Sequence, residues 1–345
     1  MLEKFFLSLL LRLPEEISHR IAIFLLKYNL VPKKKKIIKP ITKIKFLNFK
    51  LTHPVGLAAG FDKNAEALPG LLKQNFSFIE IGTVTPLPQI GNSKPRVFRV
   101  PEEKSIINKL GFPNLGASKI FNNLCKIRKY HTLGLEPLIG VNIGCNKNTK
   151  NPLKDYEKCF EIFCSVADYI TINVSSPNTP GLRKLQLQNN LAPLLKTLSN
   201  KREEYLKKNK RKIPLVLKIA PDLVDSDLKS IVKLIKSYQI EGIIATNTSI
   251  NKKIIQNKKY TKLQGGISGN ALYKNSNNIL KKLKKFSKGN ITLIGVGGID
   301  SGEKVFKKLK LGANAVQVYS SLIYNGISIV DNMVLDFIKL SKLNK

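Results

Sequence analysis

From residue 55 onward, the chain repeats one arrangement of hydrophobic and polar positions. A short apolar run, often rich in β-branched residues, ends in glycine or a polar residue and is followed by sequence of helical character. Runs that are apolar at nearly every position are typical of strands buried on both faces of a sheet. The eight runs cover residues 55–59, 78–82, 138–143, 169–174, 214–219, 242–245, 292–296 and 315–318.

The spacing of these runs predicts how the strands pair. Their starts lie 23 to 60 residues apart, so every interval has room for a crossover helix between parallel strands. Eight such units favour an α/β fold of the (β/α)8 TIM-barrel class, with a doubly wound open sheet as the alternative. The longest intervals exceed what one helix needs, and we expect them to supply lids over the barrel mouth.

The first 40 residues follow a different pattern, which predicts an amphipathic helical extension. The apolar run that begins at Phe5 ends at Arg12 and is too short for a membrane span of about 20 residues. A second amphipathic stretch, from Pro14 to Tyr28, has helical spacing, so two short helices are expected. They either dock on the barrel as a hairpin or lie in a membrane interface with lysines on lipid phosphates.

Composition adds a strong positive charge and little else that is unusual. With 59 Lys and Arg against 23 Asp and Glu, the net charge is +36, which can indicate nucleic acid or an anionic membrane as a partner. The excess is mostly lysine spread along the chain, so we interpret it as solvated helix faces and expect no nucleic-acid partner. The four cysteines form no CxxC pair and no metal-ligand spacing with the three histidines, which predicts neither a metal site nor disulfides.

The polar residues and glycines that are candidates for binding and catalysis lie where the apolar runs end. In a barrel these carboxyl ends meet at one mouth, so polar residues there indicate a site, although each alone is commonly a cap or turn residue. Gly297 and Gly298 follow the seventh run, and Tyr319 and Ser320 follow the eighth, the usual place of a phosphate site in this fold. Lys218 lies at the end of the fifth run, where its positive charge would stabilise the anionic, reduced ring of a phosphorylated cofactor. The alternative is that its side chain extends to solvent at the rim of the barrel.

Seven stretches of the sequence carry a resemblance to a known family. They closely resemble the dihydroorotate dehydrogenases of the quinone-dependent class 2 type, in the same order and over almost the whole chain. The stretches are residues 58–63, 80–86, 108–112, 173–181, 218–222, 245–248 and 295–300.

The resemblance implies an oxidoreductase that converts (S)-dihydroorotate to orotate in pyrimidine (UMP) biosynthesis. By similarity, Ser176 is the catalytic base for the C5 proton while a flavin accepts the C6 hydride. Soluble class 1 relatives carry a cysteine at this place, so Ser176 itself favours class 2. A relay through water or Thr179 is not visible in the sequence. The implied substrate-binding residues are Lys63, Asn108, Lys109, Leu110, Gly111, Phe112, Asn173, Asn178, Asn247 and Thr248.

The implied cofactor is one FMN per chain, held in the barrel mouth. The cofactor-binding residues carried over from the family are Ala59, Gly60, Thr83, Asn142, Asn173, Lys218, Thr246, Gly269, Gly298, Tyr319 and Ser320.

The electron acceptor implied by the resemblance is a membrane quinone. No cysteine cluster suits an iron–sulfur relay, and no GxGxxG follows a strand as in nicotinamide sites. Residues 1–40 would form a membrane-associating quinone tunnel lined by His19, Arg99 and Tyr319, and residues 41–345 the FMN-binding catalytic barrel. The expected protein is a monomer, bound peripherally to the cytoplasmic side of a bacterial inner membrane.

The sequence departs from the family pattern at two positions, and two alternative functions also remain open. Cys145 stands where bacterial relatives often have lysine, and Leu110 replaces a frequent methionine, which conserves volume. One alternative is a soluble flavin-dependent dihydropyrimidine or dihydrouridine reductase, for which the positive charge would help to bind tRNA. The other is a non-enzymatic anion-binding barrel.

Overall fold

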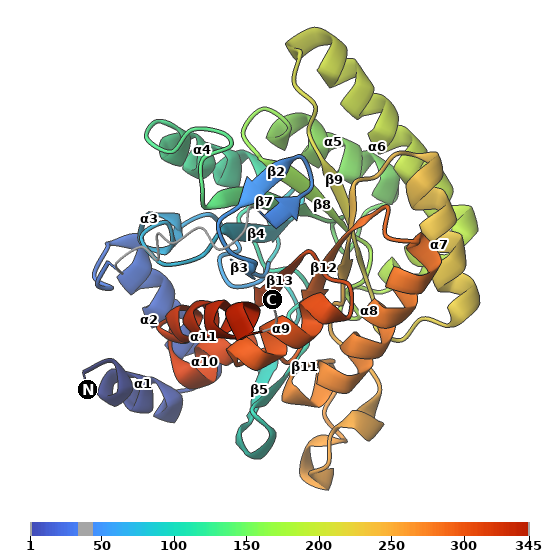
Figure 1. Cartoon of the computed structure of the whole chain (residues 1–345). Helices are drawn as coiled ribbons and strands as arrows, with labels where there is room; N and C mark the ends of the chain where they lie inside the picture. Colours follow the sequence, from blue (N-terminus) through green and yellow to red (C-terminus); the bar gives the residue numbers. More distant parts are fainter. Residues whose placement is uncertain (1, 34–43, 344–345) are drawn as a thin grey trace.

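A computed structural model describes residues 2–33 and 44–343 of the protein. Its centre is a closed barrel of eight parallel strands, which confirms the predicted (β/α)8 fold (Figure 1). The strands are β3 (Val55–Leu57), β4 (Phe78–Val84), β7 (Leu138–Ile143), β8 (Tyr169–Asn173), β9 (Leu215–Ile219), β10 (Gly242–Ala245), β12 (Thr292–Val296) and β13 (Ala315–Val318).

The strands follow one another around the barrel in chain order, and β13 pairs with β3 to close it. All eight predicted runs are strands, and β7, β10, β12 and β13 have the predicted bounds. The largest differences lie at the carboxyl ends of the first two strands, where β3 stops two residues early and β4 continues to Val84.

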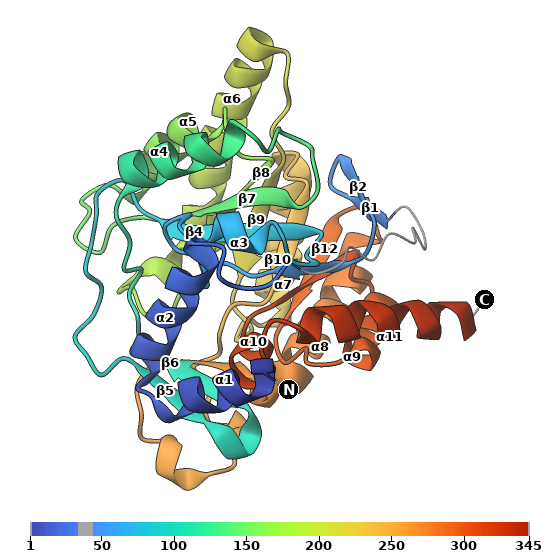
Figure 2. The same cartoon turned by 90° about the vertical axis from the view of Figure 1, so that its left-hand side faces the viewer.

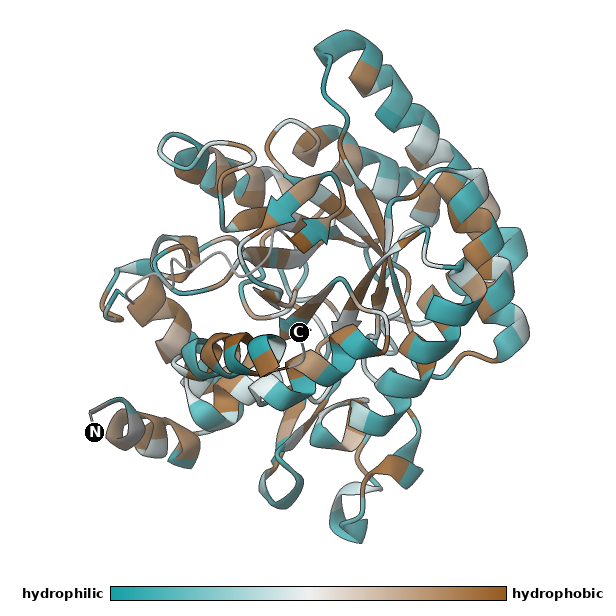
Figure 3. Cartoon of the chain, in the orientation of Figure 1, coloured by the Kyte–Doolittle hydropathy of each residue, from teal (hydrophilic) through white to brown (hydrophobic). Residues whose placement is uncertain are grey.

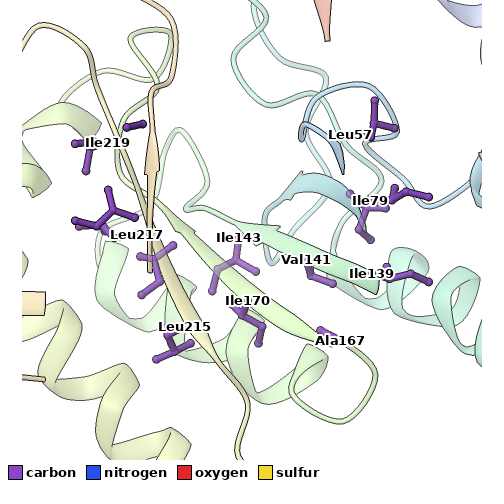
Figure 4. Close-up of a cluster of buried hydrophobic side chains, with 14 of the residues drawn as sticks. Leu57, Ile79, Ile139, Val141, Ile143, Ala167, Ile170, Leu215, Leu217 and Ile219 are labelled. Carbon is purple, nitrogen blue, oxygen red and sulfur yellow. The ribbon is translucent and has the colours of Figure 1, made fainter. Parts of the chain in front are cut away.

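Helices surround the barrel and cover its outer face (Figures 1 and 2). Apolar strand residues that point outward, such as Val141 and Leu217, pack against them in one large core (Figure 4). The helices of this layer are α3 (Leu68–Leu71), α4 (Ala117–Arg128), α5 (Pro152–Phe163), α6 (Gln188–Asn209), α7 (Asp225–Ser237), α8 (Tyr273–Ser287), α9 (Gly302–Lys310), α10 (Ser320–Asn325) and α11 (Ile329–Leu343).

Aromatic side chains fill the amino end of the barrel. The hairpin of β1 (Ile44–Phe46) and β2 (Phe49–Leu51) packs Phe46 against Phe78 and Tyr169, with ring centroids 4.6 Å and 5.7 Å apart. Gly140 makes room for this layer, because a Cβ atom there would lie 2.1 Å from the Tyr169 ring. The opposite, carboxyl end is therefore where a ligand can enter.

The long intervals in the sequence add secondary structure at that carboxyl end. A three-stranded antiparallel sheet in the order β11-β6-β5 comes from two of them and was not predicted. Its strands are β5 (Val97–Val100), β6 (Ser105–Asn108) and β11 (Gly266–Gly269). Among the described residues, the three longest intervals also hold five short 3₁₀ helices: η1 (Pro101–Glu103), η2 (Leu182–Gln186), η3 (Lys252–Ile254), η4 (Lys258–Tyr260) and η5 (Asn270–Leu272).

The two predicted N-terminal helices are present as α1 (Leu2–Arg12) and α2 (Glu15–Lys27). They dock beside β5 and α10, close to the barrel mouth, and carry a largely apolar sequence (Figures 2 and 3). No helix in the described ranges is both long and apolar enough to cross a bilayer. The predicted domain boundary at residue 40 and most of the lysine run 33–36 lie outside the described residues.

Candidate active site

The carboxyl ends of the barrel strands surround a cavity of about 1340 Å³, a volume that includes its opening to solvent. The sheet strands β6 and β11 form part of its wall. Nearly all of the predicted substrate and cofactor residues line this cavity: Ala59, Gly60, Lys63, Thr83, Asn108, Leu110, Gly111, Phe112, Asn173, Ser176, Asn178, Lys218, Thr246, Asn247, Thr248, Gly269, Gly298, Tyr319 and Ser320. Asn142 and Lys109 are the two predicted residues that do not line it.

Asn142 is fully buried and holds the residues at the base of the cavity in place. Its side-chain carbonyl accepts hydrogen bonds from the Thr83 hydroxyl at 2.6 Å and from the Asn173 amide at 3.1 Å. Asn173 also donates to Thr83 at 2.9 Å. The three side chains, from β4, β7 and β8, therefore form a closed hydrogen-bonded triangle that fixes the orientation of the two lining residues.

Glu80, which the sequence analysis did not single out, supports this triangle from inside the barrel. Its fully buried carboxylate accepts hydrogen bonds from Asn142, Tyr169, Thr171 and Gln317, at distances of 2.8 to 3.2 Å. Burial lowers the pKa of Lys218, and the negative charge of Glu80 opposes that shift. Glu80 thus provides a countercharge for Lys218, which lines the cavity.

Ser176 lies in the loop after β8, and its hydroxyl accepts a hydrogen bond from the Asn178 backbone N–H at 3.2 Å. The neighbouring Ser175 donates to Asn173 at 2.9 Å and accepts from Asn247 at 3.0 Å. Within the described residues, the buried hydroxyl of Thr179 has no hydrogen-bond partner. In the described part of the chain, the Ser176 hydroxyl makes no other side-chain hydrogen bond, and Ser176 lines the cavity.

Arg183 was also missed from the sequence, and it joins two loops of the cavity. Its guanidinium donates to the Ser175 carbonyl at 3.2 Å and to the Thr248 carbonyl at 2.7 Å. An ion pair of 2.8 Å with Asp222 orients it. The signal that could have found it is its position two residues after the end of the serine-containing stretch 173–181, but arginine is so often a surface residue that its type alone predicts nothing.

Lys63 and Asp62 follow β3 but have different roles. Asp62 accepts hydrogen bonds from the backbone N–H groups of Glu66 and Ala67, at 2.9 Å and 2.8 Å, and so stabilises the turn. The Lys63 ammonium donates to the Gly60 carbonyl at 2.7 Å and reaches the cavity. Burial lowers the pKa of Lys63 from 10.5 to about 8, with the charge of Asp62 acting in the opposite direction.

The loops after β12 and β13 meet at one side of the cavity. Gly297 and Gly298 both have positive φ angles, of 107° and 70°. A Cβ atom on Gly298 would lie 2.6 Å from the Tyr273 side chain, so the backbone there approaches α8 as closely as only glycine permits. Ser320, at the start of α10, donates to Ser268 on β11 at 3.1 Å. The arrangement presents backbone N–H groups and hydroxyls of the type that bind phosphate.

Comparison with known proteins agrees with this geometry. Residues 41–340 match the family described as dihydroorotate dehydrogenase. The chain belongs to that family. A curated relative from Bartonella tribocorum, named dihydroorotate dehydrogenase (quinone), is 40% identical over 337 residues, which cover 96% of this chain and 91% of the relative. One from Neisseria meningitidis with the same name is 44% identical over 306 residues, covering 88% and 89%.

Solved structures show the same relationship in three dimensions. The crystal structure of ligand-free DHODH from Eimeria tenella is 32% identical to this chain, covers 96% of both chains and superposes with a TM-score of 0.91. Because 96% of each chain is covered, the likeness is not limited to the eight barrel strands.

The chain has a second cavity, of about 1970 Å³ including its opening, between α1, α2 and the barrel. Its lining is mainly apolar and includes the three predicted tunnel residues His19, Arg99 and Tyr319. The two cavities have a wall in common, made by Lys63, Val97, Ile106, Leu110, Pro113, Tyr319 and Ile323. Small apolar molecules in the second cavity would thus lie next to the contents of the first.

His19 and Arg99 are held at this second cavity in different ways. The His19 ring packs edge-on against Phe61 with centroids 5.4 Å apart, and burial lowers its pKa to about 3, so the imidazole is neutral. Arg99 donates to the Leu11 carbonyl at 2.9 Å and to the Ser18 hydroxyl at 2.9 Å, while its buried Nε–H has no partner within the described residues. Arg99 therefore both anchors the helical hairpin and retains one free donor.

Proposed function

We propose that the protein oxidises (S)-dihydroorotate to orotate with FMN in the barrel mouth and delivers the electrons to a quinone in the second cavity. The observation that carries the proposal is the shared wall, because it brings a polar cavity with an acid–base side chain next to an apolar one. Membership of the dihydroorotate dehydrogenase family supports the reaction, and the names of the relatives support quinone as the acceptor.

The residues at the first cavity fit an FMN. Three buried polar atoms that line it or border it have no hydrogen-bond partner within the described part of the chain: Thr248 Oγ1, Gln317 Oε1 and Ser321 Oγ. Unpaired buried groups of this kind are costly unless a ligand satisfies them. Gly298 and Ser320 would hold the phosphate, and Thr83, Asn173 and Lys218 the ring. When bound, FMN supplies the two-electron acceptor for the C6 hydride of the substrate.

The side chains of the chain itself bind the substrate and move its proton. Lys63 would pair with the substrate carboxylate, and Asn108, Asn178 and Asn247 would hydrogen-bond the amide-like edges of the ring. Asn178 donates to Asn108 at 3.1 Å, so these two amides are already oriented together. Ser176 would take the C5 proton as its own hydroxyl proton leaves to a water or to Thr179, because a serine hydroxyl is too weak a base to retain both protons.

The second cavity suits a quinone because its lining is apolar except at a few points. The free Nε–H of Arg99 is a hydrogen-bond donor for a quinone carbonyl. The neutral His19 and the Tyr319 hydroxyl lie at the same cavity. A bound quinone would thus be oriented by polar contacts at one end and held by apolar packing along its length.

Exposed apolar side chains on α1 and α2 support a peripheral attachment to the membrane. Phe5 on α1 is 64% exposed and Phe24 on α2 54%, Leu30 just after α2 is 59% exposed, and basic residues such as Arg20 and Lys27 accompany them. Residues 1–40 would lie in the headgroup region on the cytoplasmic side of a bacterial inner membrane, and residues 41–345 would form the catalytic barrel as a monomer. The apolar cavity would then open toward the lipid.

The proposal is tested by anaerobic mixing of the full-length protein with dihydroorotate. We expect the visible band of oxidised flavin to bleach and to return on addition of a soluble quinone, but not of fumarate or NAD. Recovery with fumarate or NAD, or a preparation that binds no flavin, would contradict the proposal and favour a soluble reductase or an anion-binding barrel.

A deletion of residues 1–40 tests the role of the helical extension. The truncated protein should still be reduced by dihydroorotate but should lose turnover with a lipid quinone and binding to vesicles that contain anionic lipid. Loss of flavin binding on truncation would instead indicate that the helices serve only to hold the barrel together.

A further inference from the structure

Lys308 on α9 is a buried cation without an acidic partner. The residue has no exposed surface, and its ammonium donates to the Ser276 hydroxyl at 2.6 Å and to the Val296 carbonyl at 3.4 Å. It also lies 5.6 Å from the centre of the Tyr273 ring. No ion pair joins Lys308 to any residue in the described ranges, so its contacts are neutral groups only.

Two largely buried arginines of the described chain, by contrast, each have an acidic partner. Arg128 pairs with Asp168 at 2.9 Å, and Arg202 with Glu241 at 3.0 Å. Burial without such a countercharge lowers the pKa of Lys308 from 10.5 to about 7. A fold retains an unpaired buried charge at a cost, which suggests that the countercharge arrives with a ligand.

The neighbours of Lys308 identify where that ligand would bind. Ser276, which accepts from Lys308, lies 3.2 Å from the Gly297 carbonyl, and a Cβ atom on Gly297 would come within 2.9 Å of the Ser276 hydroxyl. Val296, the other acceptor, is the last residue of β12 and leads directly into this loop. Lys308 therefore supports the loop that contains Gly297 and Gly298, at the place where α8, α9 and β12 meet (Figure 1).

We infer that Lys308 is a positioning residue that supplies the buried positive charge for the phosphate group of the flavin nucleotide. The inference rests on the proposed function, because it takes FMN as the occupant of the first cavity. A phosphate on the loop would face the N–H groups of Gly297 and Gly298 on one side, with the ammonium behind them. The attraction acts through a desolvated region and is therefore stronger than between surface charges.

The other charged groups near α9 do not neutralise Lys308. Lys304, on the same helix, pairs with Asp300 at 2.8 Å and donates to Asn270 at 3.1 Å. From α8, the Tyr273 ring lies over both lysines. From α11, the side chain of Asp336 packs at Gly302, the first residue of α9, two turns away from Lys308. The pair Lys304–Asp300 is neutral overall, so the remaining positive charge behind the Gly297–Gly298 loop is that of Lys308 when it is protonated.

The test compares FMN with riboflavin, which lacks the phosphate, on full-length protein freed of flavin. Lys308→Met keeps the volume and removes the charge, and Lys307→Met removes an exposed charge from the same helix as the control. We expect Lys308→Met to weaken FMN binding about tenfold or more, the scale of one charge interaction in a desolvated site. Riboflavin affinity should change less than about twofold, and Lys307→Met should change neither.

An equal loss of FMN and riboflavin affinity in Lys308→Met, or unchanged FMN affinity, would overturn the inference. Failure of the wild-type protein to bind either flavin would contradict the proposed function instead, so the two failures are distinguishable.

Two further measurements separate a functional charge from a structural one. The first is titration calorimetry in two buffers at pH 7.5 to 8. The wild-type protein should take up a proton when FMN binds, because the phosphate restores the charge of Lys308. Lys308→Met should lack this uptake. The flavin-free Lys308→Met protein should melt at the same or a higher temperature than the wild type, because burying an amine without a countercharge is costly and methionine carries no such cost. Equal proton uptake in both proteins, or a lower melting temperature, would show that Lys308 serves only the packing. If Lys308→Met does not fold, Lys308→Gln gives the same comparison.

Discussion

The side-chain amide of Asn142 donates a 2.8 Å hydrogen bond to the buried carboxylate of Glu80, and this contact joins the interior of the barrel to its mouth. Through Asn142, the carboxylate determines where Thr83 and Asn173 point. The polar layer thus places a negative charge below the cavity, where Lys218 requires one. Both the stability of the barrel and the arrangement of the site therefore depend on the Glu80 side chain.

Replacing Glu80 with alanine should destabilise the protein strongly. Its four donors would be left buried without an acceptor, and we expect a loss of about 3 kcal/mol or more in the free energy of unfolding, measured by urea denaturation. The control is Glu157→Ala, which removes a half-exposed partner of Lys201 at 3.1 Å and should cost less than about 1 kcal/mol. Equal losses for the two variants would contradict the role given to Glu80.

Replacing Ser176 with alanine should slow the reduction of the flavin while leaving product binding intact. The C5 proton would lose its acceptor, and we expect reduction by dihydroorotate to be slower by about 10²-fold or more in stopped-flow experiments. Orotate should still perturb the flavin spectrum with nearly unchanged affinity, because Asn178 and Asn247 remain in place. Ser165→Ala, at an exposed position, is the control. Normal reduction by Ser176→Ala would assign the base to another group.

The barrel strands were predictable because each is buried on both faces and is therefore apolar at almost every position. The sheet of β5, β6 and β11 was missed because these strands belong to no repeating unit. Glu80 escaped notice for a related reason. It lies within an apolar run, and only the closed barrel reveals that its side chain points inward to a layer of hydrogen-bond donors.

The lysines show most clearly that the local sequence does not predict which charged residues are buried. Helix α9 carries lysines at positions 304, 307, 308 and 310, and nothing in their order distinguishes the buried Lys308 from the exposed Lys307. The same holds for Arg96, which pairs with Glu16 of α2 at 2.9 Å. Such residues are identified by the elements packed against them, which the local sequence does not contain.

The depressed pKa of Lys63 predicts a pH dependence of substrate binding. Burial lowers the pKa from 10.5 to about 8, so the ammonium is charged below pH 8 and increasingly neutral above it. Orotate affinity, followed by the change in the flavin spectrum, should be constant from pH 6 to about 7.5 and should fall above about pH 8, because only the charged lysine attracts the carboxylate.

Two variants identify the group responsible for this decline. Lys63→Met should bind orotate weakly and with little dependence on pH over the same range. Lys104→Met removes an exposed lysine that lines the same cavity, and its pH profile should match that of the wild type. A wild-type decline that survives in Lys63→Met would mean that a different group titrates.

Arg99 offers a test of how the helical hairpin serves electron transfer to the quinone. The guanidinium holds the end of α1 through the Leu11 and Leu13 carbonyls, both at 2.9 Å, and leaves Nε–H free at the second cavity. Arg99→Ala should raise the KM for a quinone about tenfold or more, the scale of losing charge-assisted hydrogen bonds, with flavin reduction by dihydroorotate unchanged. Steady-state kinetics with varied quinone, together with stopped-flow reduction, separates the two half-reactions. Arg12→Ala, which removes an exposed arginine at the end of the same helix, should change neither. If Arg99→Ala slowed flavin reduction as strongly as quinone turnover, the hairpin would be supporting the first cavity as well, and the division of labour between the two cavities would be wrong.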